Sequence, residues 1–260
     1  CALWALSPLS IASCVARSID VFPSVFVALS LLGAASFGGV FGAVLSGACV
    51  AVASSIAMYP IVLCAPLFVL LGDRRRRLFA GISFVAVAAS MAVAGSVLQG
   101  GSWKWIESVY WFVLTAPELT PNIGLWWYLF CELFTHFTVF FTIVFQINTV
   151  VYALPLAMRF KDHGVLVFWV LCATTLAMFQ PYPSISHVAL QLGLLPLVWH
   201  EVRTTRYTFS LVLVAMSLVI LLPNATKAWL ITGTGHVNFY NFATLSLQVA
   251  QLLFVSDCMS

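Results

Sequence analysis

Long apolar runs follow one another along almost the whole chain, separated by short polar joints or by Pro and Gly. Charged residues make up 7% of the 260 residues, whereas soluble domains carry about 25%. So few charges cannot hydrate a globular surface, and a bilayer is the expected solvent. The runs cover residues 22–34, 37–57, 60–71, 78–98, 126–154, 164–180, 185–200, 207–223 and 237–257.

The unbroken character of these runs favours helices over strands. Strands of a membrane β-barrel alternate between polar and apolar residues, and these runs do not alternate. A helix pairs its backbone groups locally, as lipid requires. We therefore predict an all-α, polytopic transmembrane helix bundle with about seven to nine membrane-embedded helices. These helices form a single transmembrane domain over residues 1–260.

Two of the runs are too short to cross a bilayer unaided. A span needs about 20 apolar residues, and the runs at 22–34 and 60–71 are shorter than that. Pro60 and Pro66 lie in the second run, and proline interrupts helical hydrogen bonding. We predict that both runs form broken or re-entrant helices.

The basic run at residues 74–77 sets the expected orientation, because clustered Arg and Lys stay in the cytosol. Counting from it, residues 99–121 form a Trp-rich loop on the far side, which is the side opposite this run. Residues 224–236 form a second far-side loop, which contains the glycosylation sequon Asn224-Ala225-Thr226. Four further basic residues return to the cytosolic side: Arg159, Lys161, Arg203 and Arg206.

Charge, cysteines and motifs exclude several kinds of site. The net charge is +3 and the other basic residues are scattered, which argues against nucleic acid as a partner. The seven cysteines lack CxxC spacing, so neither a disulfide framework nor a metal site is predicted. No GxSxG, HExxH or phosphate-binding glycine loop is present, and we expect no catalytic residues and no cofactor. Lipids and other membrane proteins are the expected partners.

Polar side chains interrupt the run at 126–154. Glu132 and His136 stand one helical turn apart on the predicted helix, and Gln146 and Asn148 follow them. Polar groups inside a membrane segment are expensive and are functional candidates by default. Glu132 and His136 could share a proton, but one metal ion needs further ligands that do not appear nearby. A structural hydrogen bond is the simpler explanation.

Two other clusters could meet lipid headgroups. Arg75 and Arg76 could bind anionic phospholipid, or they could act purely as a topogenic signal. On the far side, His236 and Asn238 follow the glycines at 233 and 235. These groups could bind a polyhydroxylated or phosphorylated headgroup, or they could cap the last helix.

The stretch Leu119-Thr120-Pro121-Asn122-Ile123-Gly124-Leu125-Trp126-Trp127-Tyr128 passes from polar residues into an aromatic run. We predict that Thr120 caps a helix and that Pro121 occupies its first turn. With the segments at 132–137, 144–148 and 154–157, this stretch resembles the PIG-U family, the polytopic subunits of the glycosylphosphatidylinositol (GPI) transamidase. Segments at 13–18, 59–60, 238–240 and 256–257 also resemble that family, in the same order.

The resemblance implies an endoplasmic-reticulum membrane protein similar in fold to the GT-C mannosyltransferases. It implies a non-catalytic subunit that holds the GPI lipid for attachment to proteins. The cysteine-protease-like catalytic residue belongs to another subunit of the complex. By motif, Asn238 and its neighbour His236 are the candidate GPI contacts. Because the family begins with further membrane helices, the resemblance also implies that this chain, which starts at Cys1, is partial.

Two alternatives from other classes remain open. The first is a GT-C mannosyltransferase that uses dolichol-phosphate mannose and needs an acidic residue in an early far-side loop. The sequence offers only Asp20 near its start, which is too little to support that chemistry. The second is a transporter with a proton relay through Glu132 and His136, which would require internal repeats.

Overall fold

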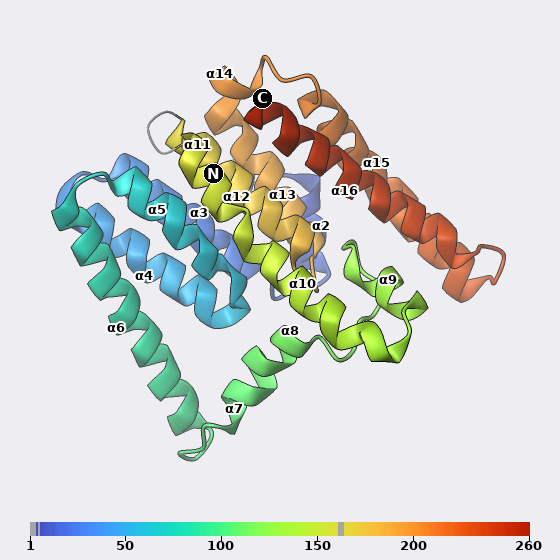
Figure 1. Ribbon diagram of the computed structural model, residues 1–260, viewed down its shortest axis with the longest axis horizontal. Coiled ribbons are helices and arrows are strands. Elements are labelled where there is room, and N and C mark those ends of the chain that lie inside the picture. The colour runs from blue at the N-terminus through green and yellow to red at the C-terminus, as the bar shows by residue number, and fades with distance from the viewer. Residues whose placement is uncertain (1–3, 5, 161–163) are drawn as a thin grey trace.

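The computed structural model describes residues 4, 6–160 and 164–260, and every regular element within them is helical. Figure 1 shows a bundle from which two arms extend, one formed by α6 (Arg74–Leu98) and one by the last two long helices. The predicted all-α class is therefore confirmed. Lys161, expected on the cytosolic side, lies outside the described residues.

The N-terminal part of the chain forms a group of closely packed helices. α4 packs against both α3 and α6. The approach to α6 is close because Gly47 faces Ala80, whose carbonyl oxygen would lie 2.2 Å from a Cβ at position 47. The Ser83 hydroxyl on α6 also donates to the Val44 carbonyl at 2.8 Å. The elements before α6 are α2 (Pro8–Val15), α3 (Val21–Ser36), α4 (Gly39–Ala57), η1 (Tyr59–Leu63) and α5 (Cys64–Leu71).

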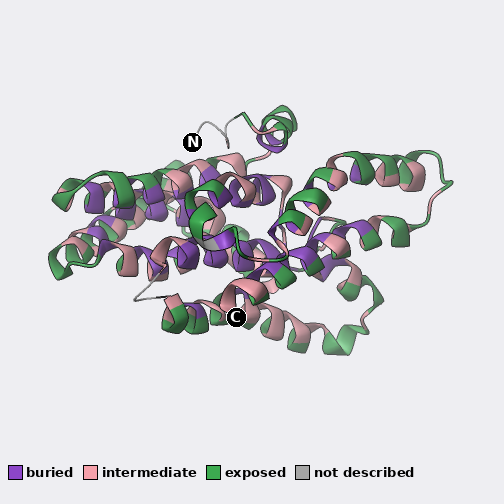
Figure 2. Ribbon diagram, turned by 90° about the horizontal axis from the view of Figure 1, so that it is seen from above, coloured by how far each residue is buried: buried purple, intermediate pink, exposed green. Residues whose placement is uncertain are grey.

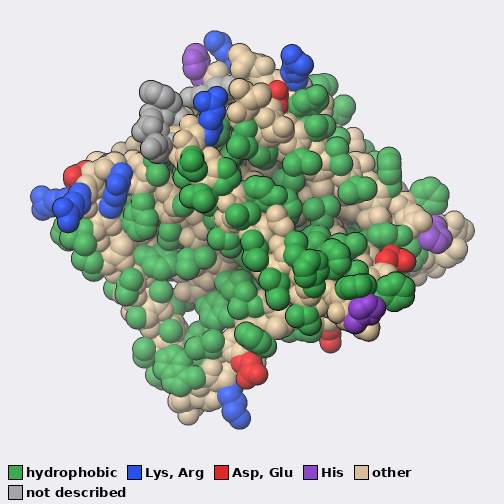
Figure 3. Space-filling view, viewed as in Figure 1, with side chains coloured by type: hydrophobic (Ala, Val, Ile, Leu, Met, Phe, Trp, Pro, Cys, Tyr) green, Lys and Arg blue, Asp and Glu red, His purple; other side chains and the backbone are tan. Residues whose placement is uncertain are grey.

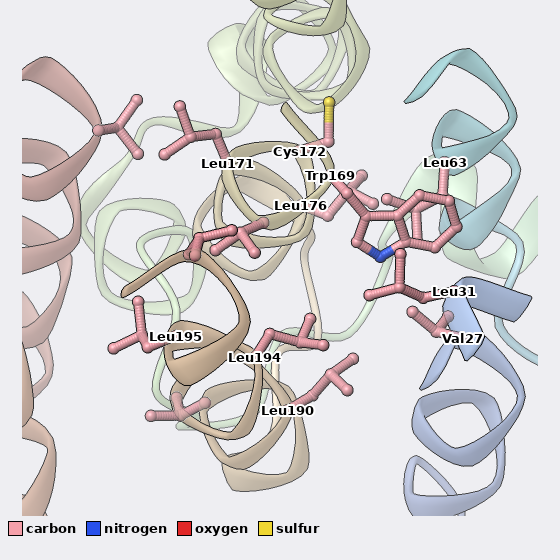
Figure 4. Packing of buried hydrophobic residues seen from close by; sticks show 14 of the residues in the cluster. Val27, Leu31, Leu63, Trp169, Leu171, Cys172, Leu176, Leu190, Leu194 and Leu195 are labelled. Atoms are coloured by element: carbon pink, nitrogen blue, oxygen red, sulfur yellow. The ribbon is translucent and has the colours of Figure 1, made fainter. Parts of the chain in front are cut away.

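The core gathers around α12 (Val165–Phe179), most of whose residues are buried. Figure 4 shows side chains of α12 lying among those of the helix that follows it and those of α3 and η1. Figure 2 shows buried residues along the inner faces of the helices and exposed residues towards the ends of the arms. After α12 come α13 (Ile185–Leu194), η4 (Leu195–Val198) and α14 (Trp199–Val202).

The run at 126–154 is not one helix, contrary to the prediction. α9 (Trp126–Glu132) ends where Leu133 and Phe134 adopt extended backbone angles. The chain then continues through η3 (Thr135–Phe137), α10 (Thr138–Val151) and α11 (Ala153–Phe160). The far-side loop before α9 also contains short helical pieces: α7 (Lys104–Ile106), η2 (Glu107–Trp111) and α8 (Phe112–Thr115).

The last two long helices form an antiparallel hairpin, seen at the right of Figure 1. They are α15 (Thr208–Thr226), which continues as the π-helical turn η5 (Lys227–Ile231), and α16 (Val237–Met259). Asn224 was expected in a loop, but it lies within α15 and its amide donates to the Ile220 carbonyl at 2.8 Å. The sequon is therefore helical, and the connecting turn shortens to residues 232–236.

Five helical stretches are long and apolar enough to cross a membrane: Gly39–Ala57, Arg74–Leu98, Thr135–Phe160, Thr208–Ile231 and Val237–Met259. Four apolar stretches are shorter: Val21–Ser36, Tyr59–Leu71, Val165–Phe179 and Ile185–Val198. The first two of these were predicted to be short. The other two were predicted to be a spanning hairpin. They are short because the chain turns at residues 180–184, where Pro181 and Pro183 oppose helix continuation.

Basic side chains gather mainly at one end of the bundle. In Figure 3 most of the visible Lys and Arg side chains lie along the upper and left edges, whereas Asp, Glu and His side chains are spread over the upper, left, lower and right parts of the view. The start of α6 lies beside the end of α3, since Arg76 Nη2 donates to the Ala34 carbonyl at 3.0 Å. The Arg206 backbone N–H likewise donates to the Asp257 carboxylate.

Candidate functional site

A hydrogen bond links the aromatic helix α9 to the start of α16. The Tyr128 hydroxyl donates to Asn238 Oδ1 at 2.7 Å, across 110 positions of sequence. Because the oxygen of the Asn238 amide is the acceptor, its Nδ2 donors are left for another partner. Asn238 is exposed, and Tyr128 is half-buried behind it.

His236 caps the same helix end. Its Nδ1 accepts a hydrogen bond from the Asn238 backbone N–H at 3.2 Å. An accepting Nδ1 implies that Nε2 carries the proton in the neutral ring, so the exposed side chain offers a donor. The capping hypothesis is therefore confirmed for His236, and its side chain still presents a donor beside Asn238. Paired N–H donors suit phosphate or hydroxyl oxygens.

An aromatic cluster packs between the helix ends that carry these two donors. The Trp127 ring is 1% exposed and packs edge-on against Tyr128 at 5.4 Å and Tyr240 at 5.6 Å between ring centroids. Trp229 of η5 lies 6.2 Å from Tyr240. Large buried rings restrict the positions of both helix ends, so the site is supported by α9, η5 and α16 together.

Asn122 holds the segment that leads into α9. Its Nδ2 donates to the Pro181 carbonyl at 3.1 Å, and its Oδ1 accepts from the Gly124 N–H at 2.7 Å. Gly124 lies so close to Pro183 that a Cβ would come within 2.6 Å of the proline ring. The helix begins only at Trp126, so the predicted cap at Thr120 and first turn at Pro121 are wrong. An Asn side chain that bonds the backbone two residues on is typical of turns.

Glu132 and His136 do not share a helix face. α9 ends at Glu132, and two extended residues separate it from His136 in η3. The His136 ring lies against Phe137, with 4.0 Å between the centroids, and is stacked on Phe134 at 5.9 Å. No group of three or more His, Cys, Asp or Glu side chains within the described ranges could hold a metal ion.

Gln146 and Asn148 serve structural hydrogen bonds. Gln146 Nε2 donates to the carbonyls of Val113 and Leu114 at 3.0 and 2.9 Å, and its Oε1 accepts from the Tyr59 hydroxyl at 2.9 Å. The amide thus fastens α8 and η1 to α10. Asn148 bonds within its own part of the chain, to the Val144 carbonyl at 2.8 Å and the Tyr152 hydroxyl at 3.1 Å.

A family model described as GPI transamidase subunit PIG-U matches residues 1–247. The chain belongs to the PIG-U family. The resemblance found in the sequence is therefore confirmed over most of the chain.

Curated relatives of this PIG-U family member carry matching names. The GPI-anchor transamidase component PIGU of Mus musculus is 33% identical over an alignment of 274 residues that covers 98% of this chain and 61% of the relative. The Homo sapiens protein of the same name is 32% identical over 270 residues, covering 97% and 60%. The GPI transamidase component GAB1 of Saccharomyces cerevisiae is 30% identical over 254 residues, covering 96% and 64%.

The chain spans less than two thirds of the length of these relatives. All of them are named as components of a GPI transamidase. These names favour the transamidase interpretation over the mannosyltransferase alternative. Together with the five apolar helices of spanning length, the family makes the chain a multi-pass membrane protein.

The two candidate phospholipid residues of this PIG-U family chain have different surroundings. Arg75 is exposed, and its guanidinium lies 5.9 Å from the centre of the Phe79 ring. Arg76 is half-buried and is bonded to the Ala34 carbonyl, while its Nε is buried with no hydrogen-bond partner within the described residues. Arg75 is therefore the more available of the two for a headgroup.

Sequence reasoning missed two residues that build the site. In the sequence Tyr128 is only one residue of an aromatic run, yet its hydroxyl orients Asn238. Gln248 is 3% exposed, and its Nε2 donates to the Ile123 carbonyl at 2.7 Å, which ties α16 to the segment before α9. A buried glutamine inside an apolar run signals a required hydrogen bond, but that signal does not name the partner.

Proposed function

We propose that this chain is a non-catalytic subunit of the GPI transamidase that holds the GPI lipid while its anchor is attached to proteins. Membership of the PIG-U family and the names of the curated relatives support this proposal. The chain acts as a single transmembrane domain over residues 1–260, in the membrane of the endoplasmic reticulum. Its partners are the other transamidase subunits, including the cysteine-protease-like catalytic subunit.

The observation that carries the proposal is the arrangement of donors at the start of α16. Tyr128 occupies Oδ1 of Asn238, and the backbone N–H of residue 238 occupies Nδ1 of His236. The two exposed side chains are left with N–H donors. A GPI headgroup offers phosphate and sugar hydroxyl oxygens, which accept such hydrogen bonds. In this proposal the headgroup lies on the far, lumenal side and the acyl chains lie in the membrane.

Arg75 has a separate role in the proposal. Its exposed guanidinium at the cytosolic end of α6 contacts the phosphate of an anionic phospholipid, an attraction worth about 1 kcal/mol per basic residue near the surface. Arg76 contributes mainly charge, because it is already bonded to the end of α3.

Complementation of cells that lack their own family member tests the GPI site. Asn238→Leu should lower surface display of a GPI-anchored reporter about tenfold, as expected when a charge-assisted hydrogen bond is lost. Ser246→Ala is the matched control, because Ser246 lies on the same helix and bonds only to the Phe242 carbonyl at 2.8 Å. Display unchanged by Asn238→Leu would refute the site. Co-purification of the other subunits separates lipid recognition from loss of assembly.

A further inference from the structure

The break between α9 and α10 opens a groove on the surface of the protein. The groove has a volume of about 730 Å³, within the range of sites that hold small ligands. Its aromatic lining is open to the outside, since Phe134 is 72% exposed, Phe137 46% and Phe140 61%. The full lining consists of one carboxylate and apolar side chains: Glu132, Leu133, Phe134, Phe137, Phe140 and Phe141.

The groove lies at the end of a membrane-crossing stretch. Thr135–Phe160 is long and apolar enough to span, and Glu132 lies three residues before its start. The opposite end of the stretch carries Arg159, on the expected cytosolic side. The groove is thus at the depth of the lipid headgroups on the far side, and Phe140 and Phe141 extend from it towards the hydrocarbon region.

The negative charge of Glu132 determines which kind of ligand suits the groove. Glu132 is exposed, and its carboxylate forms no hydrogen bond or ion pair with any other residue that the structure describes. A carboxylate at the edge of the hydrocarbon region favours a cationic partner. The rings of Phe134 and Phe137 line the same groove as Glu132, and aromatic faces attract ammonium groups. A carboxylate next to aromatic rings is therefore suited to an ammonium that can also donate N–H bonds.

The exterior of α10 fits lipid better than a partner helix. Val139, Ile143, Ile147 and Val150 are 70%, 54%, 56% and 53% exposed. Helices that pack in membranes use small residues to approach closely, and these side chains are large and branched. This exposed face of α10, which adjoins Phe140 of the groove, is therefore suited to acyl chains.

We propose that this groove binds a membrane phospholipid with a primary ammonium headgroup, an ethanolamine phospholipid. Glu132 accepts hydrogen bonds from the ammonium, the rings of Phe134 and Phe137 flank it, and one acyl chain follows Phe140 along α10. This site is separate from Asn238 and His236, so it does not depend on the GPI proposal.

The test is lipid retention by the chain purified from membranes with the subunits that accompany it. The complex is placed in nanodiscs of phosphatidylcholine that contain trace spin-labelled phosphatidylethanolamine or phosphatidylcholine. We expect the ethanolamine probe to be immobilised about tenfold more than the choline probe, the scale of a charge-assisted hydrogen bond. Glu132→Gln should abolish this preference. Glu107→Gln, which changes an exposed carboxylate outside the groove, should leave it intact.

Two further measurements keep the test decisive. If Glu132→Gln does not give a monodisperse complex, Phe134→Leu keeps the carboxylate and should reduce immobilisation of the ethanolamine probe severalfold by removing one ring. Equal immobilisation of the two probes by the wild-type complex would overturn the proposal. The proposal would also fail if Glu107→Gln abolished the preference as fully as Glu132→Gln, or if a crosslinker at Phe137 captured a partner subunit instead of lipid.

Discussion

The Tyr128 hydroxyl donates a 2.7 Å hydrogen bond to Oδ1 of Asn238, and this contact fixes which end of the Asn238 amide faces outwards. Without it, the amide could turn and present its oxygen, which would repel a phosphate. Tyr128 is itself held by its contact with the buried Trp127 ring. The orientation of one exposed amide thus depends on the core of a different helix.

Tyr128→Phe removes the orienting hydroxyl and keeps the ring. We expect surface display of a GPI-anchored reporter to fall about three- to tenfold, the scale of one neutral hydrogen bond. Thermal stability should change little, because the bond lies at the surface. Tyr207→Phe is a suitable control, since no hydrogen bond of its hydroxyl occurs within the described residues. If display is unchanged in Tyr128→Phe, the amide does not need this orientation.

Gln146→Leu should destabilise the protein. The substitution removes three hydrogen bonds and leaves the Tyr59 hydroxyl, whose residue is 6% exposed, without its partner. An unpaired buried polar group costs about 1–3 kcal/mol, and a lower melting temperature in detergent would report it. Asn148→Leu is the matched control on the same helix, and we expect a smaller loss because Asn148 joins no distant element. Equal losses of stability in the two variants would contradict the conclusion that Gln146 fastens α8 and η1 to α10.

The sequence predicted the class of fold well, because apolar runs directly record which segments face lipid or core. It failed between Glu132 and Thr135, where no Pro or Gly marks the break. Periodicity could not show that α9 is anchored separately from α10. The anchor is a hydrogen bond in which Trp126 Nε1 donates to the Phe179 carbonyl at 2.7 Å. That bond joins positions 53 residues apart, and local pattern carries no information about such contacts.

The candidate site was predicted only in part. Asn238 and His236 were identified because polar residues after a Gly-rich turn stand out in an apolar chain. Their arrangement depends on Tyr128, which looks like any interfacial aromatic residue in the sequence. The ends of α12 were predicted to within one residue, but not its burial in the core. A helix buried in protein and a helix facing lipid are equally apolar, so the sequence does not distinguish them.

Gly47→Ala should disrupt the packing of α4 on α6. A Cβ at this position would lie 2.2 Å from the Ala80 carbonyl oxygen, so the helices would have to separate. Overpacking of this kind costs about 1–3 kcal/mol, measurable as a lower melting temperature and a lower yield of monodisperse protein. Gly81→Ala is the control, because the nearest atom to its Cβ, on Phe68, lies 4.0 Å away. An equally low melting temperature in both variants would show that replacing a glycine destabilises the protein for a reason other than overpacking between α4 and α6.

Tyr182 should make stability depend on pH at the alkaline end. Its hydroxyl donates to the Glu118 carbonyl at 2.9 Å and anchors the far-side loop. Burial, together with the Glu118 carboxylate, raises the pKa of Tyr182 above its ordinary value. The folded protein therefore holds this proton more tightly than the unfolded chain does. The resulting stability is complete below the unfolded pKa of about 10 and is lost as the pH rises through the folded pKa.

The variant Tyr182→Phe isolates this effect from the titration of other groups. We expect the wild type to melt at a higher temperature than Tyr182→Phe below pH 10, and the difference to shrink as the pH rises further. Tyr110 is also outside the membrane-spanning stretches and its pKa is raised by burial, so Tyr110→Phe serves as the comparison. Because Tyr110 donates to the Ser55 carbonyl at 3.0 Å rather than to the loop, protease cleavage near Glu118 should increase in Tyr182→Phe but not in Tyr110→Phe. A difference in melting temperature that stays constant up to pH 12 would show that the Tyr182 hydroxyl does not couple folding to its proton.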